Sequence, residues 1–425
     1  MKVLKAGSRG PSVQLLQLAL NRAGFGPLET DGIFGSATGQ AVKRFQASQG
    51  LASDGIAGSS THRALLPWYT GFVTHRVHRG ETLSSIAELY GSSLGAVFTA
   101  NPETEPLNLP VGSAVTVPLP FPVVPTDIAY SAALVAYCVR GLSARYPFIK
   151  TGDIGRSVMG RPLWSLALGS GANRVIYNAT HHANEWICTP LLLKFTEELA
   201  QAYTSGGTVY GSSAAELLSY ASLSIIPCLN PDGMDLVTGE LQSGSYYSAA
   251  SELAADYPRF PFPDGWKANI RGIDLNLQYP AGWAQAKAIK FSQGIRSPAP
   301  ADYVGSAALS APESRALYRH TLSFDPALIL AYHTQGRVIY WQYQDFEPAG
   351  SRRIGALFSE ASGYALEETP YASGFAGYKD WFIQDFDRPG YTIEAGLGEN
   401  PLPLSDFDSI YRENLGILTL AALVT

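Results

Sequence analysis

The sequence predicts a multi-domain protein in which two small N-terminal modules precede a large α/β domain. Its 425 residues exceed the usual size of one domain, and 46% hydrophobic against 16% charged residues is enough to build several cores. A short motif repeats near the N-terminus, a proline-rich stretch follows the modules, and strand-like and helix-like runs alternate after it. We place the two modules, the linker and the large domain at residues 1–67, 73–120, 121–127 and 128–425.

The first module contains an internal repeat, "DGIFGSAT" at 31–38 and "DGIAGSST" at 54–61. Each Asp-Gly pair predicts a turn, and the following Ser or Thr is expected to cap the next helix. "PSVQLLQLALNRAGF" and "ATGQAVKRFQASQGL" carry apolar residues at helical spacing, so the segment predicts a small helical domain. The DG-x-x-G-x-x-T turn followed by "AVKRFQ" resembles the peptidoglycan-binding domain of cell-wall hydrolases.

The second module, "THRVHRGETLSSIAELYGSSLGAVFTANPE" followed by "SAVTVP", predicts a β-α-α-β order. This pattern resembles a LysM domain, which implies binding of the N-acetylated glycan of peptidoglycan or chitin. His75 and His78 fall on a predicted strand at i, i+3, where side chains point to opposite faces, so we interpret them as surface residues rather than metal ligands. The prolines of "PLPFPVVPT" then predict a semi-rigid linker.

Composition narrows the classes of partner and location. A net charge of −6 and a pI near 5.7 argue against nucleic-acid binding. Three dispersed cysteines, Cys138, Cys188 and Cys228, fit neither a disulfide framework nor a cysteine zinc site, and we expect them to be buried thiols. No apolar run is long enough for a membrane span, and the N-terminus lacks the apolar core of a signal peptide.

The stretch "NATHHANEWICTP" (178–190) carries the first candidate metal ligands. It follows the predicted buried strand "RVIYNAT", and ligands gather at strand ends in α/β folds. Zinc favours imidazole nitrogen and carboxylate oxygen, with three protein ligands in catalytic sites. His182 and Glu185 are spaced i, i+3, so a tight turn brings both together, whereas His181 with Glu185 would need an already helical loop.

A third ligand and a base must come from distant segments. His333 ends the predicted strand "PALILAYHT" and is the best remaining histidine, because the others lie in the small modules or, like His320, in a polar helical stretch expected to be exposed. Glu394 interrupts the apolar strand "GYTIEAG", where a carboxylate is either paired or catalytic. Glu394 is thus the candidate general base for metal-assisted hydrolysis.

Together these segments resemble the zinc carboxypeptidase family. "HHANEWI" is similar to its H-x-x-E-W motif, "AYHTQG" to its third-ligand strand, "YTIEAG" to its catalytic-glutamate strand and "IIPCLNPDGMDL" to its N-P-D-G turn. The resemblance implies an α/β mixed-sheet domain in which zinc is the cofactor. It implies the following roles: His182, Glu185 and His333 as zinc ligands, Glu394 as general acid/base, Tyr371 as a substrate hydrogen-bonding group, and Lys267, with Arg271 as fallback, polarising the scissile carbonyl.

One departure from the family pattern bears on the substrate. In "IDLNLQYP" Asn276 is kept, but Leu277 stands where the carboxypeptidases have the arginine that clamps a C-terminal carboxylate. The architecture instead resembles the γ-D-glutamyl-L-diamino acid endopeptidase branch, which cuts the γ-D-glutamyl–diaminopimelate bond of peptidoglycan stems. Candidate substrate-binding residues are Asn276, Asn184, Lys379 and Arg337, the last two as partners for the distal carboxylate of diaminopimelate.

We therefore expect a zinc peptidoglycan peptidase whose partners are glycan and stem peptides, located in the bacterial cell wall or a spore compartment. Two alternatives stay open. One is a carboxypeptidase that removes C-terminal residues from wall peptides. The other is a non-catalytic wall- or spore-binding protein with a degenerate peptidase domain.

Overall fold

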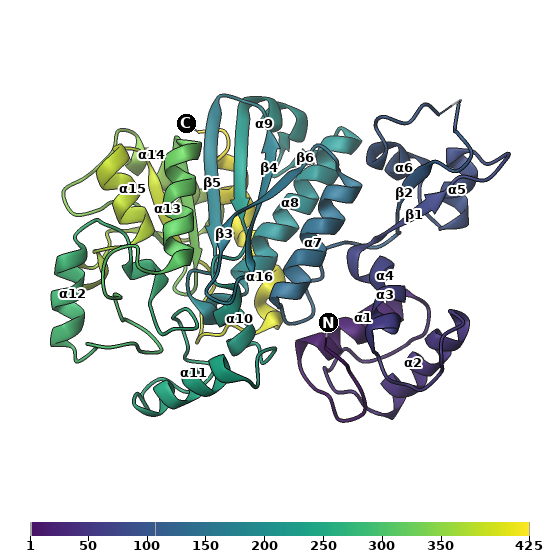
Figure 1. The fold of residues 1–425 in the computed structure, drawn as a ribbon. Helices are drawn as coiled ribbons and strands as arrows, with labels where there is room; N and C mark the ends of the chain where they lie inside the picture. The colour runs from purple at the N-terminus through teal and green to yellow at the C-terminus, as the bar shows by residue number, and fades with distance from the viewer. Residues whose placement is uncertain (1, 107, 425) are drawn as a thin grey trace. The chain divides into compact units, whose positions relative to one another are not determined.

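The computed structural model describes residues 2–106 and 108–424, which form two compact units, Met1–Lys150 and Thr151–Thr425 (Figure 1). Among these residues, no helix combines the length and apolar character needed to cross a membrane. The elements of the first unit are α1 (Pro11–Arg22), α2 (Ser36–Ser48), α3 (Ser59–Ala64), α4 (Leu66–Thr70), β1 (Phe72–Arg76), α5 (Leu83–Leu89), α6 (Leu94–Ala100), β2 (Ala114–Pro118) and α7 (Ala132–Arg145).

The repeat of the first module is held by two equivalent glutamines. The Gln17 amide donates to Asp31 Oδ1 (2.8 Å) and to the carbonyl of Ile33 (3.1 Å), and its oxygen accepts from the Gly32 backbone N–H (3.0 Å). Gln46 repeats this pattern with the second copy: it donates to Asp54 (2.8 Å) and to the Ile56 carbonyl (3.0 Å), and accepts from Gly55 (2.9 Å). Each Asp-Gly turn is therefore locked onto the preceding helix by one buried amide.

The expected Ser or Thr caps of these helices do not form. The N-cap residues of α2 and α3 are Gly35 and Gly58, and neither helix has a side-chain cap. The threonines of the repeat have a different role, because Thr38 accepts from Gln17 (3.2 Å) and Thr61 from Gln46 (3.1 Å). The threonines of the motif thus complete the glutamine network rather than the helix ends.

The second module has the predicted β-α-α-β order, with β1 paired antiparallel to β2. Its core contains Val77, Leu83, Ile86, Val97, Val115 and Val117. Thr82 caps α5 by accepting from the Ser85 N–H (3.1 Å). The prediction that His75 and His78 point to opposite faces is wrong, because β1 ends at Arg76 and the turn that follows brings the two rings to a centroid distance of 5.7 Å.

The proline-rich segment is packed rather than free. Val123 and Val124 are buried, and the Arg145 guanidinium, on α7, donates to the carbonyls of Gly71 (2.8 Å) and Leu119 (2.7 Å). Helix α7 packs within the first compact unit, whereas the sequence predicts a large domain that begins at residue 128. The segment therefore joins the modules to a helix that packs with them.

The second unit is built on an eight-stranded mixed sheet in the order β11-β10-β12-β9-β5-β8-β4-β3. Its strands are β3 (Lys150–Arg156), β4 (Pro162–Gly169), β5 (Asn173–Ala179), β8 (Ala221–Ile226), β9 (Leu328–His333), β10 (Val338–Tyr340), β11 (Ala365–Glu367) and β12 (Gly390–Glu394), with a separate hairpin of β6 (Thr208–Val209) and β7 (Ser212–Ser213). The mixed α/β sheet that the family resemblance implied is present.

Helices cover both faces of this sheet, with α8 and α16 on one side and α13 and α15 on the other (Figure 1). The α-helices are α8 (Cys188–Ser205), α9 (Ala214–Tyr220), α10 (Pro231–Val237), α11 (Ser245–Ala255), α12 (Trp283–Ser292), α13 (Pro312–Phe324), α14 (Ser351–Ser362), α15 (Tyr378–Phe386) and α16 (Phe407–Leu420). The short 3-10 helices are η1 (Ala183–Glu185), η2 (Leu275–Leu277), η3 (Tyr371–Ser373) and η4 (Leu404–Asp406).

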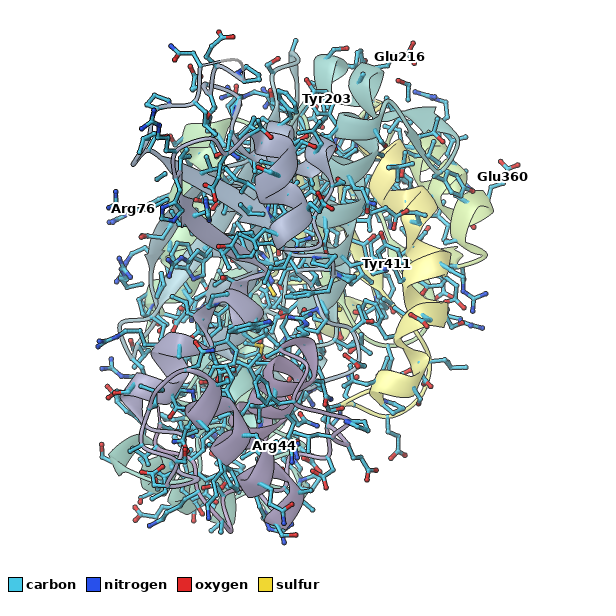
Figure 2. The ribbon with its side chains drawn as sticks, turned by 90° about the vertical axis from the view of Figure 1, so that its right-hand side faces the viewer. Arg44, Arg76, Tyr203, Glu216, Glu360 and Tyr411 are labelled. Atoms are coloured by element: carbon cyan, nitrogen blue, oxygen red, sulfur yellow. The ribbon has the colours of Figure 1, made fainter. Side chains whose placement is uncertain are left out.

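The central strands are buried on both faces, as their continuous apolar runs predict. On β5, Ile176 joins the core under α13 and α15, whereas the Tyr177 ring packs on Phe195 of α8. Tyr177 also donates to the carbonyl of Leu418 (2.9 Å), on α16. Figure 2 shows Tyr411 on the same helix, and its hydroxyl donates to Glu198 of α8 (2.7 Å). The C-terminal helix is thereby fixed to the sheet that carries the site.

The middle of the sheet sets up the site. Strands β5, β9 and β12 are adjacent and parallel, so their carboxyl ends meet at one edge. The register places Glu394 opposite His333, the last residues of β12 and β9. The chain leaves β5 at Ala179 and enters the His-His loop directly. Two candidate metal ligands and the candidate base therefore leave neighbouring strands at the same level.

We expect Gln46→Leu to destabilise the first module selectively. Leucine fills the space but leaves the buried Gly55 N–H and Thr61 hydroxyl without the amide, which costs roughly 2 to 4 kcal/mol. Native-state amide exchange of the full chain should show at least about 30-fold faster exchange in α2 and α3 and no change in α8. Gln49→Leu, at an exposed position just after α2, is the matched control. Equal exchange rates in the two variants would contradict the role of the buried amide.

Candidate metal centre

Three side chains from two segments converge at the edge of the sheet. His182 is the N-cap residue of η1 and Glu185 is its last residue, so the tight turn expected from the i, i+3 spacing is present. His333 ends β9, beside them. His182 Nδ1 lies 2.9 Å from Glu185 Oε1, His333 Nδ1 lies 2.8 Å from Glu185 Oε2, and the two Nδ1 atoms are 3.2 Å apart.

This donor set fits a zinc ion. Ligand atoms placed about 2.0 to 2.1 Å from a tetrahedral zinc are separated from one another by about 3.3 Å. The three separations, 2.8 to 3.2 Å, are close to that value. Both Nδ1 atoms face one point together with the carboxylate, an arrangement in which neighbouring lone pairs repel unless a cation or proton lies among them. Two imidazoles and one carboxylate also leave a coordination position for water, as catalytic zinc sites require.

The loop that carries His182 is held in place by its backbone and by the N-P-D-G turn. The Ala183 N–H donates to the carbonyl of Lys267 (3.0 Å). The Asn230 amide donates to the carbonyls of His181 (3.1 Å) and Ala268 (3.0 Å), and so ties the His-His loop to the segment that carries Lys267. Asn230 of the N-P-D-G motif therefore holds together the His-His loop and the loop that carries Lys267.

Asp274 is a site residue that the sequence reasoning missed. Its Oδ1 lies 3.2 Å from His182 Nε2, the ring nitrogen that faces away from Glu185. A carboxylate at this position fixes the tautomer and the ring orientation of a ligating histidine. The signal that could have revealed it is "IDLN", where an aspartate follows an apolar residue and lies two positions before Asn276.

The electrostatics of the centre favour a cation. Burial alone would raise the pKa of Glu185, which is 1% exposed, but His182, Lys267 and His333 outweigh it and hold that pKa well below its usual range. Burial lowers the pKa of the His182 imidazole, yet Glu185 and Asp274 raise it to about 9. Negative potential that attracts a proton to His182 attracts a metal cation equally.

Glu394 and Lys267 complete the charged groups. Burial raises the pKa of Glu394, partly offset by His333 and reinforced by Glu185. The ammonium of Lys267 lies 3.2 Å from Glu185 Oε1. A raised carboxyl pKa and a nearby ammonium are what a proton-transfer group and an oxyanion-binding group need.

The other histidines have different environments. His181 is buried, its Nε2 lies 3.1 Å from the Tyr279 hydroxyl, and its ring stacks on His333 at 5.5 Å. Burial lowers the pKa of His181 well below its usual range, so it is a neutral packing partner. The expectation that His320 is exposed is wrong, because the ring is half-buried with Nε2 2.8 Å from Ser224 Oγ.

A pocket of about 300 Å³ opens beside the centre. Besides His182, His333, Lys267, Asp274 and Glu394, its lining includes Asn276, Leu277, Lys290, Asp302, Lys379 and Asp380. Two ion pairs lie in this wall. Lys379 contacts Asp380 at 2.6 Å with both side chains 4% exposed, and Lys290 contacts Asp302 at 2.6 Å. The pocket thus offers both signs of charge a short distance from the metal ligands.

The sequence-predicted site residues divide into two groups. The pocket lining contains Lys267, Asn276, Lys379 and Glu394. Tyr371 is 64% exposed on η3, between the lining residues Pro370 and Ser373. Its position on the rim is compatible with a group that contacts substrate after it enters.

Three other predicted residues, Arg271, Asn184 and Arg337, make their contacts away from this pocket. Arg271 lies instead in a separate, apolar pocket with Tyr246 and Tyr303. The Asn184 amide donates to the backbone carbonyl of Asp264 (3.1 Å), and Arg337 is paired with Glu413. Of the two basic residues considered for polarising the scissile carbonyl, Lys267 alone lies at the metal centre, and Arg337 is already engaged elsewhere.

Comparison with known proteins agrees with this geometry. The sequence model described as zinc carboxypeptidase matches residues 135–416, and one described as a putative peptidoglycan binding domain matches residues 9–65. The gamma-D-glutamyl-L-diamino acid endopeptidase 1 of Lysinibacillus sphaericus is 41% identical over 288 residues, which cover 68% of this chain and 71% of that protein. The uncharacterized protein YqgT of Bacillus subtilis (strain 168) is 40% identical over 276 residues, covering 64% and 72%.

Among solved structures, bovine thrombin-activatable fibrinolysis inhibitor in complex with tick carboxypeptidase inhibitor aligns with a TM-score of 0.54 and 18% identity, covering 70% of this chain and 97% of that one. At this identity the likeness shows a shared fold. The two matched ranges end before and begin after the β-α-α-β module, and the LysM identity of that module stays a prediction.

We expect Asp274→Asn to weaken zinc binding about 10- to 100-fold, because the amide cannot hold the His182 ring as a carboxylate does. Chelator competition, with zinc measured in the retained protein, gives the affinity directly. Asp256→Asn, at an exposed position after α11, is the control and should bind as the parent does. Parental zinc affinity in the Asp274 variant would exclude its orienting role.

Proposed function

We propose that this chain, which belongs to the zinc carboxypeptidase family and is a zinc metallopeptidase, hydrolyses the γ-D-glutamyl–meso-diaminopimelate bond of peptidoglycan stem peptides. Three observations support the proposal. The His182–Glu185–His333 donor set lies beside Glu394 at one sheet edge. The relative that is 41% identical is named for cleavage of such a bond. The first module matches a peptidoglycan-binding domain.

The observation that carries the proposal is the wall of the pocket at Leu277. Recognition of a C-terminal carboxylate needs a guanidinium that forms two parallel hydrogen bonds, and an apolar side chain offers none. Leu277 lines the pocket in the position where the family resemblance puts that arginine. Asn276 beside it accepts from the Tyr378 N–H through its side-chain oxygen (3.0 Å), and its single amide nitrogen cannot reproduce the two parallel hydrogen bonds of a guanidinium. The pocket therefore favours a substrate that is not anchored by its main-chain terminus.

Each group at the centre has a defined task in this reaction. His182, Glu185 and His333 would hold zinc, which supplies Lewis acidity to lower the pKa of water and polarise a carbonyl. Glu394 accepts a proton from the attacking water and delivers it to the amine that leaves. Lys267 donates to the oxygen of the scissile carbonyl as negative charge develops there. Asp274 keeps the His182 ring in the orientation that this requires.

The two ion pairs of the pocket match the distal end of diaminopimelate. That end carries an amine and a carboxylate on one carbon, so its recognition needs one group of each sign. Lys379–Asp380 and Lys290–Asp302 supply them within the lining. Lys379 is fixed by Asp380 and by the Gln342 carbonyl (2.6 Å), so its ammonium is ordered before substrate arrives. We propose that Lys379 binds the distal carboxylate and an aspartate binds the distal amine.

The N-terminal unit would hold the enzyme on its insoluble substrate. Two weak binding modules linked to a catalytic domain raise the local concentration of cleavable bonds. We propose that the β-α-α-β module is a LysM domain that binds glycan next to the peptidoglycan-binding domain. The protein would then act at the cell wall or in the spore compartment, where its substrate lies.

We expect the parent enzyme to cleave a tetrapeptide stem into L-Ala-γ-D-Glu and meso-diaminopimelyl-D-Ala, as seen by mass spectrometry. Glu394→Gln should lose about four orders of magnitude or more in rate while keeping zinc, because the amide cannot accept the proton of water. Release of D-Ala alone would establish a carboxypeptidase. Zinc-loaded parent enzyme that cleaves no stem would instead support a non-catalytic binding protein.

We expect Lys379→Met to reduce the preference for diaminopimelate stems over lysine stems by about 10- to 100-fold, the worth of one charge-assisted hydrogen bond. The ratio of kcat/KM for the two stems measures the preference and cancels any general loss of activity. Lys287→Met, on α12 but outside the pocket lining, is the matched control. An unchanged ratio in the Lys379 variant would remove Lys379 from substrate recognition.

A further inference from the structure

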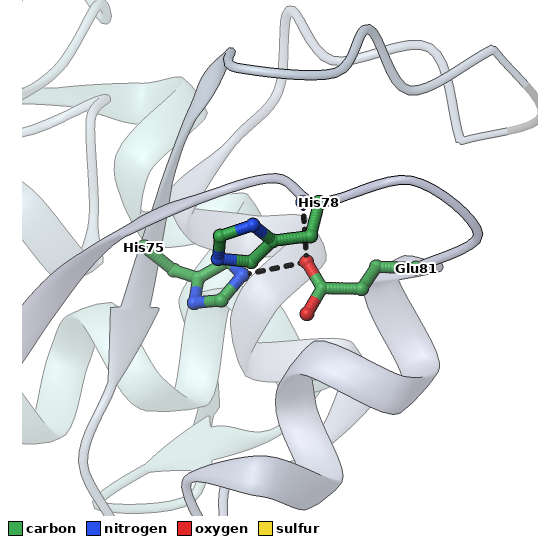
Figure 3. A group of neighbouring side chains, drawn as sticks. All are labelled: His75, His78 and Glu81. Carbon is green, nitrogen blue, oxygen red and sulfur yellow. Dashed lines mark hydrogen bonds and ion pairs between the residues drawn. The ribbon is translucent and has the colours of Figure 1, made fainter.

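We infer that His75, His78 and Glu81 form a second site for a zinc-type divalent metal, located in the β-α-α-β module (Figure 3). Each residue offers one ligand atom, and these atoms lie within 4.8 Å of one another. Among the described residues, this group and the centre at His182 are the two clusters of this kind. The inference concerns a different compact unit from the catalytic one and does not depend on the proposed hydrolysis.

The chain brings the two histidines together by ending β1 at Arg76. Within the strand His75 points inward and is 6% exposed, whereas its neighbour Arg76 points outward into solvent (Figure 2). After the strand the backbone turns, and the exposed His78 ring lies edge-on to His75 at 76°. A strand that continued through His78 would have kept the two rings apart.

Glu81 is held in place as the carboxylate ligand. Its Oε2 accepts from the backbone N–H of His78 (2.7 Å) and lies 2.7 Å from His75 Nε2 (Figure 3). These two contacts order the carboxylate oxygen before any metal arrives, which reduces the entropy cost of binding.

Tyr90 supplies the second contact that ligating histidines usually have. Its hydroxyl lies 3.0 Å from His75 Nδ1, the ring nitrogen on the far side from Glu81. When Nδ1 donates to this hydroxyl, the Nε2 lone pair points at the carboxylate, and a cation between them relieves the repulsion. A metal-binding histidine typically donates its other N–H to such a partner. The buried His75 is therefore oriented like a ligand.

The ligand types define the metal class and the consequence of binding. Two imidazoles and one carboxylate suit zinc and its neighbours in the transition series, and an exposed site takes water in the remaining positions. The three ligand atoms lie within 4.8 Å of one another. Rotation of the exposed His78 side chain can bring its nitrogen to the separation of about 3.3 Å that a tetrahedral site needs. The bound ion would clamp the turn between β1 and α5.

Metal content distinguishes this site from the catalytic one. Full chain dialysed against buffered free zinc should hold about two ions, His78→Ala about one, His333→Ala about one, and the double variant none. Arg79→Ala, a change at the exposed residue next to His78, is the matched control and should hold two. His78 is exposed, so its removal leaves the module folded.

A second readout places the ion. Zinc should slow amide exchange in residues 77–90 of the parent and of His333→Ala, but not of His78→Ala. His78→Ala should still hydrolyse muropeptides at the parental rate. One ion per chain in the parent, or unchanged zinc content in His78→Ala with no protection of 77–90, would overturn the second site and leave a histidine–carboxylate hydrogen-bond network.

Discussion

The buried carboxylate of Glu185 is the constraint around which the peptidase unit is organised. A charge at 1% exposure is stable only when cations or strong donors surround it. His182 and His333 approach one oxygen each, and Lys267 approaches from the segment before Asp274. Those neighbours come from different parts of the chain, so the sheet register, the η1 turn and the N-P-D-G clamp must all be formed before the carboxylate is compensated. The buried charge of Glu185 destabilises the fold if no cation compensates it, and the same charge attracts a metal ion to the site.

Much of the metal centre could be predicted from the residues that end the predicted strands. His333 and Glu394 each close an apolar run, a pattern that favours a buried strand, and because β9 and β12 are parallel their last residues share one edge. The i, i+3 spacing of His182 and Glu185 similarly describes a turn that the backbone adopts. Asp274 was missed because the one signal for it, the aspartate of "IDLN", carries no spacing that links it to His182. The folded loop brings the two side chains together. The same holds for the choice of Lys267 over Arg271, which lie on one short segment and diverge into separate pockets.

Two predictions about polar side chains in the N-terminal modules, both made from local sequence patterns, were wrong. A continuing strand predicts His75 and His78 on opposite faces, but β1 ends at Arg76 and the two rings lie 5.7 Å apart. In the first module the composition of the repeat was read as helix capping, whereas the buried amides of Gln17 and Gln46 recruit its threonines. In both cases a long-range partner, invisible in local sequence, decided the role of a polar side chain.

At helix α7, the domain boundary defined by sequence similarity differs from the boundary defined by packing. The family's sequence pattern begins at residue 135, inside the helix, while the packing of Arg145 on the Gly71 and Leu119 carbonyls assigns the helix to the unit before it. The range matched by the family model and the first compact unit therefore overlap in helix α7. A cut in the proline-rich segment would therefore separate α7 from the Gly71 and Leu119 carbonyls that accept from Arg145. A peptidase domain joined to other N-terminal modules must keep these contacts or acquire equivalent ones.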